Sequence, residues 1–490
     1  MLFNTIDYIL FLPAVTAVFF ILPHRCRHIF LFIASCWFYM QWNPRCIALL
    51  LGCIAVTWTG AMMLDRPGNT PGLRRAVLAV CLLINLGILG IFKYAAFAAG
   101  LLNRVLIRAG AAPVRPPEIV LPVGISFFTL QALGYLIDVY RREIPAERDP
   151  VRYGLFVSFF PQLVAGPIER SKNLMHQLKE KHALRYDDVR RGLLLILYGL
   201  FLKMVIADRI SPIVDAVYSD PQSWPGIAAA AATGLFAIQI YCDFYGYSVI
   251  AAGSAQLLGI RLMSNFEAPF LSASVQELWS RWHISLSTWF RDYLYIPLGG
   301  GRRGFLKKLR NLMIVFGISG LWHGASLGFV LWGLLNGLFQ AVEEIRKHFF
   351  PKNGGRTAER PLGIAGALLC RVRTFVLFLA ALVFFRAGGI RPALRVYEAL
   401  LSGPHTEIFE SGAFLSLGQG VKDFKILAAA AALLFAVDLL KYRGVRPDEK
   451  VLSLPFPLRY LCMALLFFAV LLFGCYGDTY SAQQFIYFQF

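Results

Sequence analysis

Residues 311–346 read NLMIVFGISGLWHGASLGFVLWGLLNGLFQAVEEIR, and they form two apolar segments, 311–324 and 325–346, with a histidine near the end of the first. A helix rises 1.5 Å per residue, so about 20 apolar residues cross a hydrocarbon core of about 30 Å. The pair of segments therefore predicts two helices that enter or cross a membrane. His323, a polar residue near the end of the first segment, has to be explained by packing or by chemistry.

Similar apolar segments recur over the whole chain. Candidate spans lie at 2–22, 29–42, 45–64, 76–93, 94–109, 121–140, 151–168, 190–210, 227–257, 311–324, 325–346, 364–386, 425–441 and 457–476. Several are short or broken by Gly and Pro, which is tolerated at membrane depth only where the backbone is buried in protein or lines a wet cavity. We expect an all-α polytopic membrane protein with about 11–14 transmembrane or re-entrant helices.

The hydrophilic stretches between these segments are short. The longest are 168–190, 258–310, 347–363 and 387–424. None has the size of a typical separate domain, so we expect one integral membrane domain over residues 1–490.

Composition and charge agree with a membrane protein. The chain is 57% hydrophobic and 16% charged, against about 25% charged residues in soluble proteins. Its formal charge of +19 does not indicate nucleic-acid binding, because Lys and Arg gather in loops between spans, as the positive-inside rule expects. The basic loops 23–28 and 65–75 would both be cytoplasmic, with the N-terminus outside. Leu2–Leu22 lacks a basic start and a cleavage site, which indicates a retained span and not a signal peptide.

His323 is the first candidate for chemistry. It lies 11 residues after Leu312, where the apolar run begins, which is roughly 16 Å along a helix and about halfway through a bilayer. An ionisable group at that depth is a functional hypothesis, since its burial is costly. Histidine can take up and release a proton near neutral pH. The alternative is a neutral histidine bonded to a carbonyl between packed helices.

A second candidate region is Glu277–Tyr295, where aromatic residues alternate with charges. Trp279 and Trp282 flank Arg281, a mixture typical of the membrane interface, and the alternative is a surface helix with no other role. The region contains a second histidine, His283. The two histidines do not form an H-E-x-x-H pattern, so no metal site is predicted.

A glycine-rich, basic loop follows this region. Gly299, Gly301 and Gly304 fit G-x-G-x-x-G, but no strand precedes them, so a dinucleotide site is rejected. The loop would either meet phosphates of a carrier such as coenzyme A or, more simply, act as a positive-inside loop.

Asp243 and Tyr241 form a third candidate site, because Asp243 is a charge inside an apolar span. A structural anchor, paired with an Arg or a Tyr, and a catalytic role both stay open. The nine cysteines include no C-x-x-C pair, and no G-x-S-x-G motif indicates a serine hydrolase.

Four stretches of this sequence resemble the membrane-bound O-acyltransferase family, in particular its bacterial branch of alginate O-acetylation and teichoic-acid D-alanylation proteins. They are Phe160–Ile168, Tyr241–Phe244, Glu277–Gly301 and Trp322–Gly324. The ending Gln484–Phe490 looks most like the alginate-type members. The resemblance covers nearly the whole chain, with a motif core at 121–346.

The resemblance implies a body of many helices with a central funnel or tunnel. It implies that His323 is the essential residue and that His283 is its companion. The candidates for binding the donor or substrate are Trp279, Trp282, Arg281, Trp322, Asp243 and Tyr241. No cofactor and no metal are expected, and the acyl donor would be cytoplasmic acetyl-CoA.

The resemblance also implies a place and partners. The protein would lie in the bacterial inner membrane and pass an acetyl group to an extracytoplasmic SGNH-hydrolase-like protein, which completes O-acetylation of a polysaccharide. An alginate-like exopolysaccharide is favoured, and peptidoglycan or another cell-wall glycan stays open. Outside the enzymes, the alternatives are a transporter, which the lack of inverted repeats disfavours, and a scaffold subunit of an envelope synthase.

Overall fold

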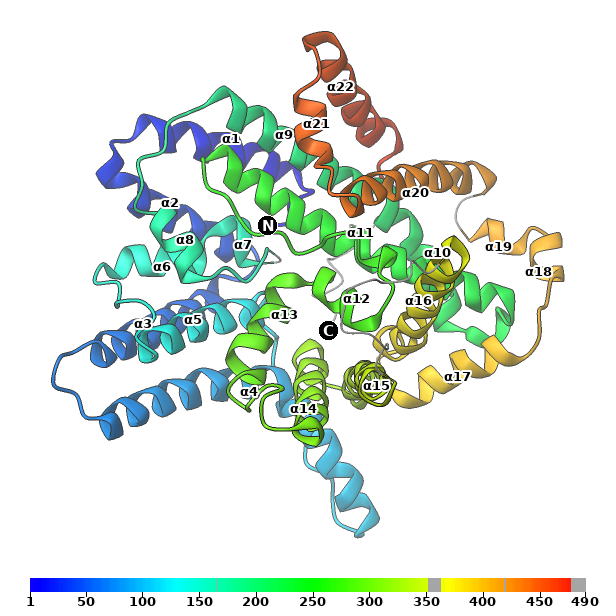
Figure 1. Ribbon diagram of the computed structural model, residues 1–490, viewed down its shortest axis with the longest axis horizontal. Coiled ribbons are helices and arrows are strands. Elements are labelled where there is room, and N and C mark those ends of the chain that lie inside the picture. The colour runs from blue at the N-terminus through cyan, green and yellow to red at the C-terminus, as the bar shows by residue number, and fades with distance from the viewer. Residues whose placement is uncertain (165, 351–362, 418–419, 477–490) are drawn as a thin grey trace. The chain divides into compact units, whose positions relative to one another are not determined.

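The computed structural model describes residues 1–164, 166–350, 363–417 and 420–476. The chain divides into two compact units, the first with residues 1–196 and 247–263, the second with residues 197–246 and 264–490. Across the described residues the regular structure is helical and contains no strand, which confirms the predicted all-α class (Figure 1). The prediction of one domain over residues 1–490 stays a prediction.

Five helical segments of the described residues are long and apolar enough to cross a membrane. They are Pro44–Leu64, Pro71–Arg108, Ile227–Leu257, Ile364–Arg386 and Phe456–Phe473. Two shorter apolar helices, Ile6–Ile21 and Ile125–Tyr140, do not reach that length alone. Large apolar side chains are exposed along Ile6–Ile21, Pro71–Arg108, Ile364–Arg386 and Phe456–Phe473, as a lipid-facing surface requires, whereas Ile125–Tyr140 and most of Ile227–Leu257 are buried.

The first unit contains the N-terminal helices and the end of α11. Its elements are α1 (Ile6–Ile21), α2 (His24–Met40), η1 (Pro44–Cys46), α3 (Ile47–Leu64), α4 (Pro71–Arg108), α5 (Ile125–Tyr140), α6 (Pro150–Ser158), α7 (Phe160–Leu163), α8 (Ser171–Gln177) and most of α9 (Tyr186–Leu200). Helices α3, α4 and α5 pack against one another, as Figure 1 shows in blue and cyan. A Cβ on Gly60 of α3 would lie 2.4 Å from the Sγ of Cys81 in α4, so the glycine allows this close packing.

Two expectations for this unit are wrong. The spans predicted at 76–93 and 94–109 are one helix of 38 residues, α4. The helix continues through the predicted boundary because neither Lys93 nor Tyr94 is a helix-breaking residue. Thr70 caps its start by accepting a hydrogen bond from the N–H of Leu73 at 3.2 Å. Conversely, the single span predicted at 151–168 is two short helices, α6 and α7, because the chain turns at Phe159, where φ is −51° and ψ is 113°.

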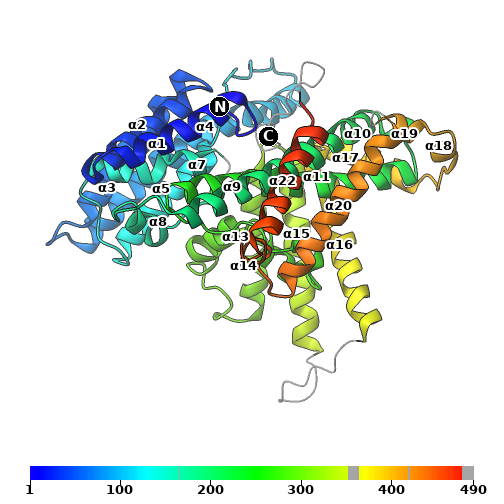
Figure 2. The ribbon, with the colours of Figure 1, turned by 90° about the horizontal axis from the view of Figure 1, so that it is seen from above.

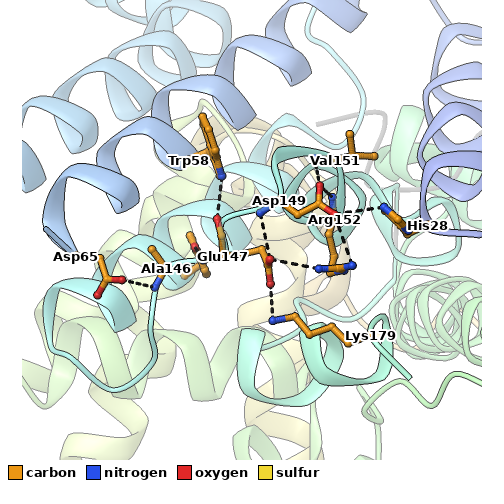
Figure 3. Close-up of polar contacts among 10 residues, drawn as sticks. His28, Trp58, Asp65, Ala146, Glu147, Asp149, Val151, Arg152 and Lys179 are labelled. Carbon is orange, nitrogen blue, oxygen red and sulfur yellow. Dashed lines mark hydrogen bonds and ion pairs between the residues drawn. The ribbon is translucent and has the colours of Figure 1, made fainter. Parts of the chain in front are cut away.

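A polar network fixes the loop between α5 and α6 (Figure 3). The Glu147 carboxylate pairs with Lys179 at 2.5 Å and with Arg152 at 3.4 Å. The carbonyl of Glu147 accepts a hydrogen bond from the indole of Trp58 in α3 at 2.9 Å. Asp149 accepts from the N–H of Val151 at 2.9 Å and so caps α6. The network joins this loop to α3 and to the segment after α8.

The second unit holds the remaining helices. They are α10 (Asp208–Ser219), α11 (Ile227–Leu257, up to residue 246), α12 (Val275–Arg281), α13 (Ile284–Phe290), α14 (Phe305–His323), α15 (Leu327–Phe349), α16 (Ile364–Arg386), α17 (Ile390–Leu401), α18 (Glu407–Glu410), α19 (Ala413–Ser416), α20 (Val421–Tyr442), α21 (Pro447–Leu452) and α22 (Phe456–Phe473). Two π-helical segments, η2 (Phe201–Ala207) and η5 (Arg291–Tyr295), and two 3-10 turns, η3 (Pro221–Ser223) and η4 (Pro269–Leu271), complete it. Helices α15 and α16 pack along each other in Figure 2.

Helices α14 and α15, predicted as 311–324 and 325–346, pack with their backbones in close approach. A Cβ on Gly320 of α14 would lie 2.3 Å from the carbonyl oxygen of Phe329. A Cβ on Gly333 of α15 would lie 2.2 Å from the carbonyl oxygen of Phe316. Side chains other than hydrogen would force the helices apart, so these glycines fix the end of α14, where His323 lies.

Candidate functional site

His323 is the last residue of α14, and only 4% of its surface is exposed. The helix ends because Gly324 takes an extended conformation with φ −162°. A Cβ on Gly324 would lie 2.2 Å from the ring of Phe329, so only glycine fits this turn. Ser326 then caps α15 by accepting a hydrogen bond from the N–H of Phe329 at 3.4 Å. The sharp turn keeps His323 between two packed helices.

His283 lies between α12 and α13 and is fully buried. Its φ of 45° and ψ of 53° are left-handed, a conformation that is uncommon outside glycine and is found at functional sites. Asn265 holds the turn after it, because its carbonyl accepts from the N–H of Ile284 at 2.9 Å and its Oδ1 accepts from the hydroxyl of Ser285 at 2.6 Å. The ring of Phe244 packs edge-on against the imidazole at 4.6 Å.

The second unit brings the two histidines together. Their ring centroids are 6.4 Å apart, and Trp322 lies 6.1 Å from His283 and 4.9 Å from His323. Burial lowers the pKa of His283 to about 3, so this imidazole is neutral at physiological pH. Aromatic rings pack against both imidazoles, and such an apolar setting strengthens any hydrogen bond or proton transfer that occurs there.

Helices α15 and α16 supply the other wall of this site. Trp332 and Phe385 pack edge-on against the His323 imidazole, with centroid distances of 4.9 and 5.6 Å. Trp279 packs against Trp332 at 5.6 Å, and its indole N–H donates to the Oδ1 of Asn336 at 3.2 Å. We call Trp279, Trp322, Trp332 and Phe385 the aromatic wall. It encloses a buried base in an apolar setting, as acyl transfer away from water requires.

Comparison with known proteins identifies the family. The family model of membrane-bound O-acyltransferases matches residues 140–375, which include both histidines and the aromatic wall except Phe385. The chain is 35% identical over 444 residues to the Pseudomonas putida protein named "Probable alginate O-acetylase AlgI", covering 90% of this chain and 88% of that protein. This chain belongs to the membrane-bound O-acyltransferase family. It is therefore a multi-pass membrane acyltransferase, which confirms the predicted family and enzyme class.

Two further relatives of this membrane-bound O-acyltransferase carry other names. The "Peptidoglycan O-acetyltransferase" of Helicobacter pylori is 34% identical over 433 residues, covering 82% of this chain and 80% of that protein. The "Teichoic acid D-alanyltransferase" of Streptococcus thermophilus is 28% identical over 256 residues, covering 49% and 61%. The alginate-type ending predicted at Gln484–Phe490 lies outside the described residues.

The remaining candidates of the amphipathic region lie at different places in the acyltransferase. The region consists of α12, α13 and the π-helical segment η5. Trp282 is buried between the rings of Phe266 and Phe378, at 5.0 and 5.3 Å. Trp279 and Trp282 are therefore core residues of the unit and not parts of a simple surface helix. Arg281 pairs with Glu277 at 2.9 Å and lies over the ring of another residue, Tyr442, at 4.7 Å. A role of these residues in donor binding stays a prediction.

Tyr241 and Asp243, on α11, anchor two other helices of the acyltransferase. The Tyr241 hydroxyl donates to Asp438 of α20 at 2.9 Å. Asp243 pairs with the buried Lys203 at 2.8 Å, and Lys203 also pairs with Asp208 at 2.8 Å. One partner of Asp243 is thus a lysine, a residue type that the sequence did not suggest. Lys203 lies in a π-helical segment, which directs its side chain into this buried cluster.

The glycine-rich loop before α14 is an exposed basic turn. Gly299 and Gly304 have φ of 104° and 102°, conformations that glycine adopts without strain. The side chain of Asn311 donates to the carbonyl of Gly300 at 3.0 Å and fixes the loop on α14. Arg302 and Arg303 are exposed beside it, so contact with coenzyme A phosphates stays a prediction.

The sequence did not single out Trp332, Phe385 or Asn336. One signal was available, because Trp332 and Asn336 are one helical turn apart in the apolar segment 325–346, and a polar amide in such a segment must face protein.

Proposed function

We propose that this acyltransferase transfers an acetyl group from cytoplasmic acetyl-CoA across the membrane, for O-acetylation of an extracytoplasmic polysaccharide. The observation that carries the proposal is the pair of buried histidines, 6.4 Å apart, beside the aromatic wall. The names of the relatives with the highest coverage support acetyl transfer to a polysaccharide, whereas the D-alanyltransferase relative covers only 49% of the chain.

In the proposed reaction His323 is the general base. It takes the proton of the accepting hydroxyl while the hydroxyl oxygen bonds to the carbonyl carbon of the thioester. The carbon–sulfur bond then breaks, and the thiolate of coenzyme A leaves with the proton that His323 held. The thioester supplies the driving force, so the protein provides alignment, proton transfer and exclusion of water. His283 and the neighbouring tryptophans would position the donor.

The favoured final acceptor of the acetyl group is an alginate-like exopolysaccharide. The acetyl group would first reach an extracytoplasmic SGNH-hydrolase-like protein, with the acyltransferase in the bacterial inner membrane and its N-terminus outside. Peptidoglycan is the second candidate acceptor, because the Helicobacter pylori relative is nearly as similar, at 34% identity. Identification of the polymer that loses O-acetyl groups when the gene is deleted would decide between them.

The test of the reaction uses the purified full-length protein in detergent with radiolabelled acetyl-CoA. The wild type should bind acetyl-CoA and release free coenzyme A, and His323→Ala should lower this rate by about 10²- to 10⁴-fold, the usual contribution of a general base. His176→Ala, an exposed histidine on α8, is the control and should match the wild type. A folded His323→Ala variant with the wild-type rate would overturn the proposal.

A further inference from the structure

Trp332 belongs to the aromatic wall, and its ring contacts the imidazole of the proposed base, His323. It is in the second turn of α15 and only 2% exposed. Its ring packs edge-on against the rings of His323, Trp279 and Phe385, with centroid distances of 4.9, 5.6 and 5.2 Å. Its only polar group is the indole N–H.

No atom of the described residues accepts a hydrogen bond from the Nε1 of Trp332. A buried tryptophan N–H nearly always has an acceptor, because leaving a buried donor unsatisfied is costly. The adjacent Trp279 shows the usual state, since its N–H donates to the Oδ1 of Asn336 at 3.2 Å. The other end of the Asn336 amide donates to the carbonyl of Trp332 at 2.8 Å. The side-chain amide of Asn336 is thus bonded to Trp279 and to the backbone of Trp332, and the indole N–H of Trp332 has no acceptor among the described residues.

An uncharged donor in an apolar wall matches an acceptor that is neutral in the ground state and becomes negative during the reaction. Acyl transfer has such an acceptor, the carbonyl oxygen of the thioester, and donors placed toward it stabilise the transition state. An uncharged N–H suits an uncharged carbonyl oxygen better than a free carboxylate or phosphate, which Arg and Lys bind more strongly. The ring contacts of Trp332 place this N–H among His323, Trp279 and Phe385. The ligand that fits is therefore the acyl carbonyl.

We propose that the indole N–H of Trp332 binds the carbonyl oxygen of the acyl thioester and stabilises the oxyanion that forms next to His323. This assignment rests on the proposed function. As the hydroxyl oxygen bonds to the carbonyl carbon, the electron pair of the C=O double bond moves onto the oxygen, where the N–H of Trp332 donates to it. When the pair returns, the carbon–sulfur bond breaks and the thiolate takes the proton from His323.

The test compares Trp332→Phe with the wild type in acetyl-CoA turnover. Phenylalanine keeps an aromatic ring and removes the donor, so kcat should fall by about 10²-fold or more while KM changes little. Binding of S-ethyl-CoA, a thioether without the carbonyl oxygen, should be unchanged. Trp58→Phe, which removes an indole N–H bonded to the carbonyl of Glu147 in the first unit, is the control and should keep the wild-type kcat.

A purely packing role for Trp332 predicts other results. If Trp332→Phe keeps the wild-type kcat, or weakens S-ethyl-CoA binding as much as turnover, the assignment is overturned. If Trp332→Phe does not fold, Trp332 is replaced by benzothienylalanine, which keeps the bicyclic ring without the N–H. A loss of kcat in that variant supports the assignment, and the wild-type kcat overturns it. The wild type and His323→Ala, measured alongside, separate a failure of this assignment from a failure of the proposed function.

Discussion

The imidazole rings of His283 and His323 lie 6.4 Å apart, centroid to centroid, although one precedes α13 and the other ends α14. Two features of the backbone produce this relationship. His283 adopts a left-handed conformation that turns the chain between α12 and α13, and Gly324 ends α14 directly after His323. The spacing of the two rings therefore depends on the backbone conformation at His283 and Gly324 as well as on the imidazole side chains.

The left-handed backbone at His283 predicts different effects for two substitutions. Asparagine tolerates φ of 45°, whereas alanine does so at a cost of about 1–2 kcal/mol. His283→Asn should therefore unfold near the wild-type temperature, and His283→Ala several degrees lower. Both should show a raised KM for acetyl-CoA if His283 positions the donor. Thermal unfolding in detergent, with acetyl-CoA kinetics on the same samples, tests this, and equal stability of the two variants would contradict it.

The sequence predicted several elements closely, for local reasons. The segment 227–257 coincides with α11, because turns at Gly226 and Gly259, with φ of 62° and 79°, bound its apolar run. By contrast, the spans predicted at 76–93 and 94–109 are one helix, α4, which contains Lys93. A single lysine does not interrupt helical hydrogen bonds, so the helix continues past it.

The site was predictable only in part. His323 and His283 attract attention by residue type and position, and the family motifs include both. Trp332 and Phe385 do not, because aromatic residues at helical spacing also describe any buried helix face. Their role depends on the packing of α15 against α14 and of α16 against α15, which only tertiary structure reveals. Arg281, prominent in the sequence, is instead paired with Glu277.

The close approach of α14 and α15 predicts a severe effect of one methyl group. Gly333→Ala places a Cβ 2.2 Å from the carbonyl oxygen of Phe316, so the helices must separate at a cost of about 1–3 kcal/mol. His323 ends α14, so acetyl-CoA turnover should fall as well. The matched control is Gly317→Ala on the same interface, whose Cβ would meet only the flexible Leu334 side chain at 3.3 Å. Similar unfolding temperatures for both variants would contradict the packing described.

The buried ion cluster predicts a large loss of stability when its cation is removed. Lys203→Met leaves the carboxylates of Asp208 and Asp243 buried without this partner, which should lower the free energy of unfolding by about 3–5 kcal/mol. Lys308→Met is the comparison, because Lys308 pairs with Glu344 at a partly exposed site and should cost no more than about 1 kcal/mol. Denaturant unfolding of both variants in detergent measures the difference. A loss no larger in Lys203→Met than in Lys308→Met would mean that the cluster does not stabilise the fold.

Glu169, in the loop after α7, predicts a dependence of stability on pH. Burial raises the pKa of this carboxyl to about 7. Hydrogen bonds from the N–H of Met263 at 2.5 Å and from the Asn173 side chain at 2.6 Å lower the pKa, but by less than burial raises it. Between the ordinary value of 4.5 and about 7, the folded state holds a proton that the unfolded state has lost. The stability that Glu169 contributes is therefore complete below pH 4.5 and is lost as the pH rises to about 7, with a slope of up to about 1.4 kcal/mol per pH unit. Glu169→Gln mimics the protonated form, so its free energy of unfolding should exceed that of the wild type increasingly from pH 5 to pH 7. Unfolding of both proteins across this range tests the sign, which a constant difference between them would refute.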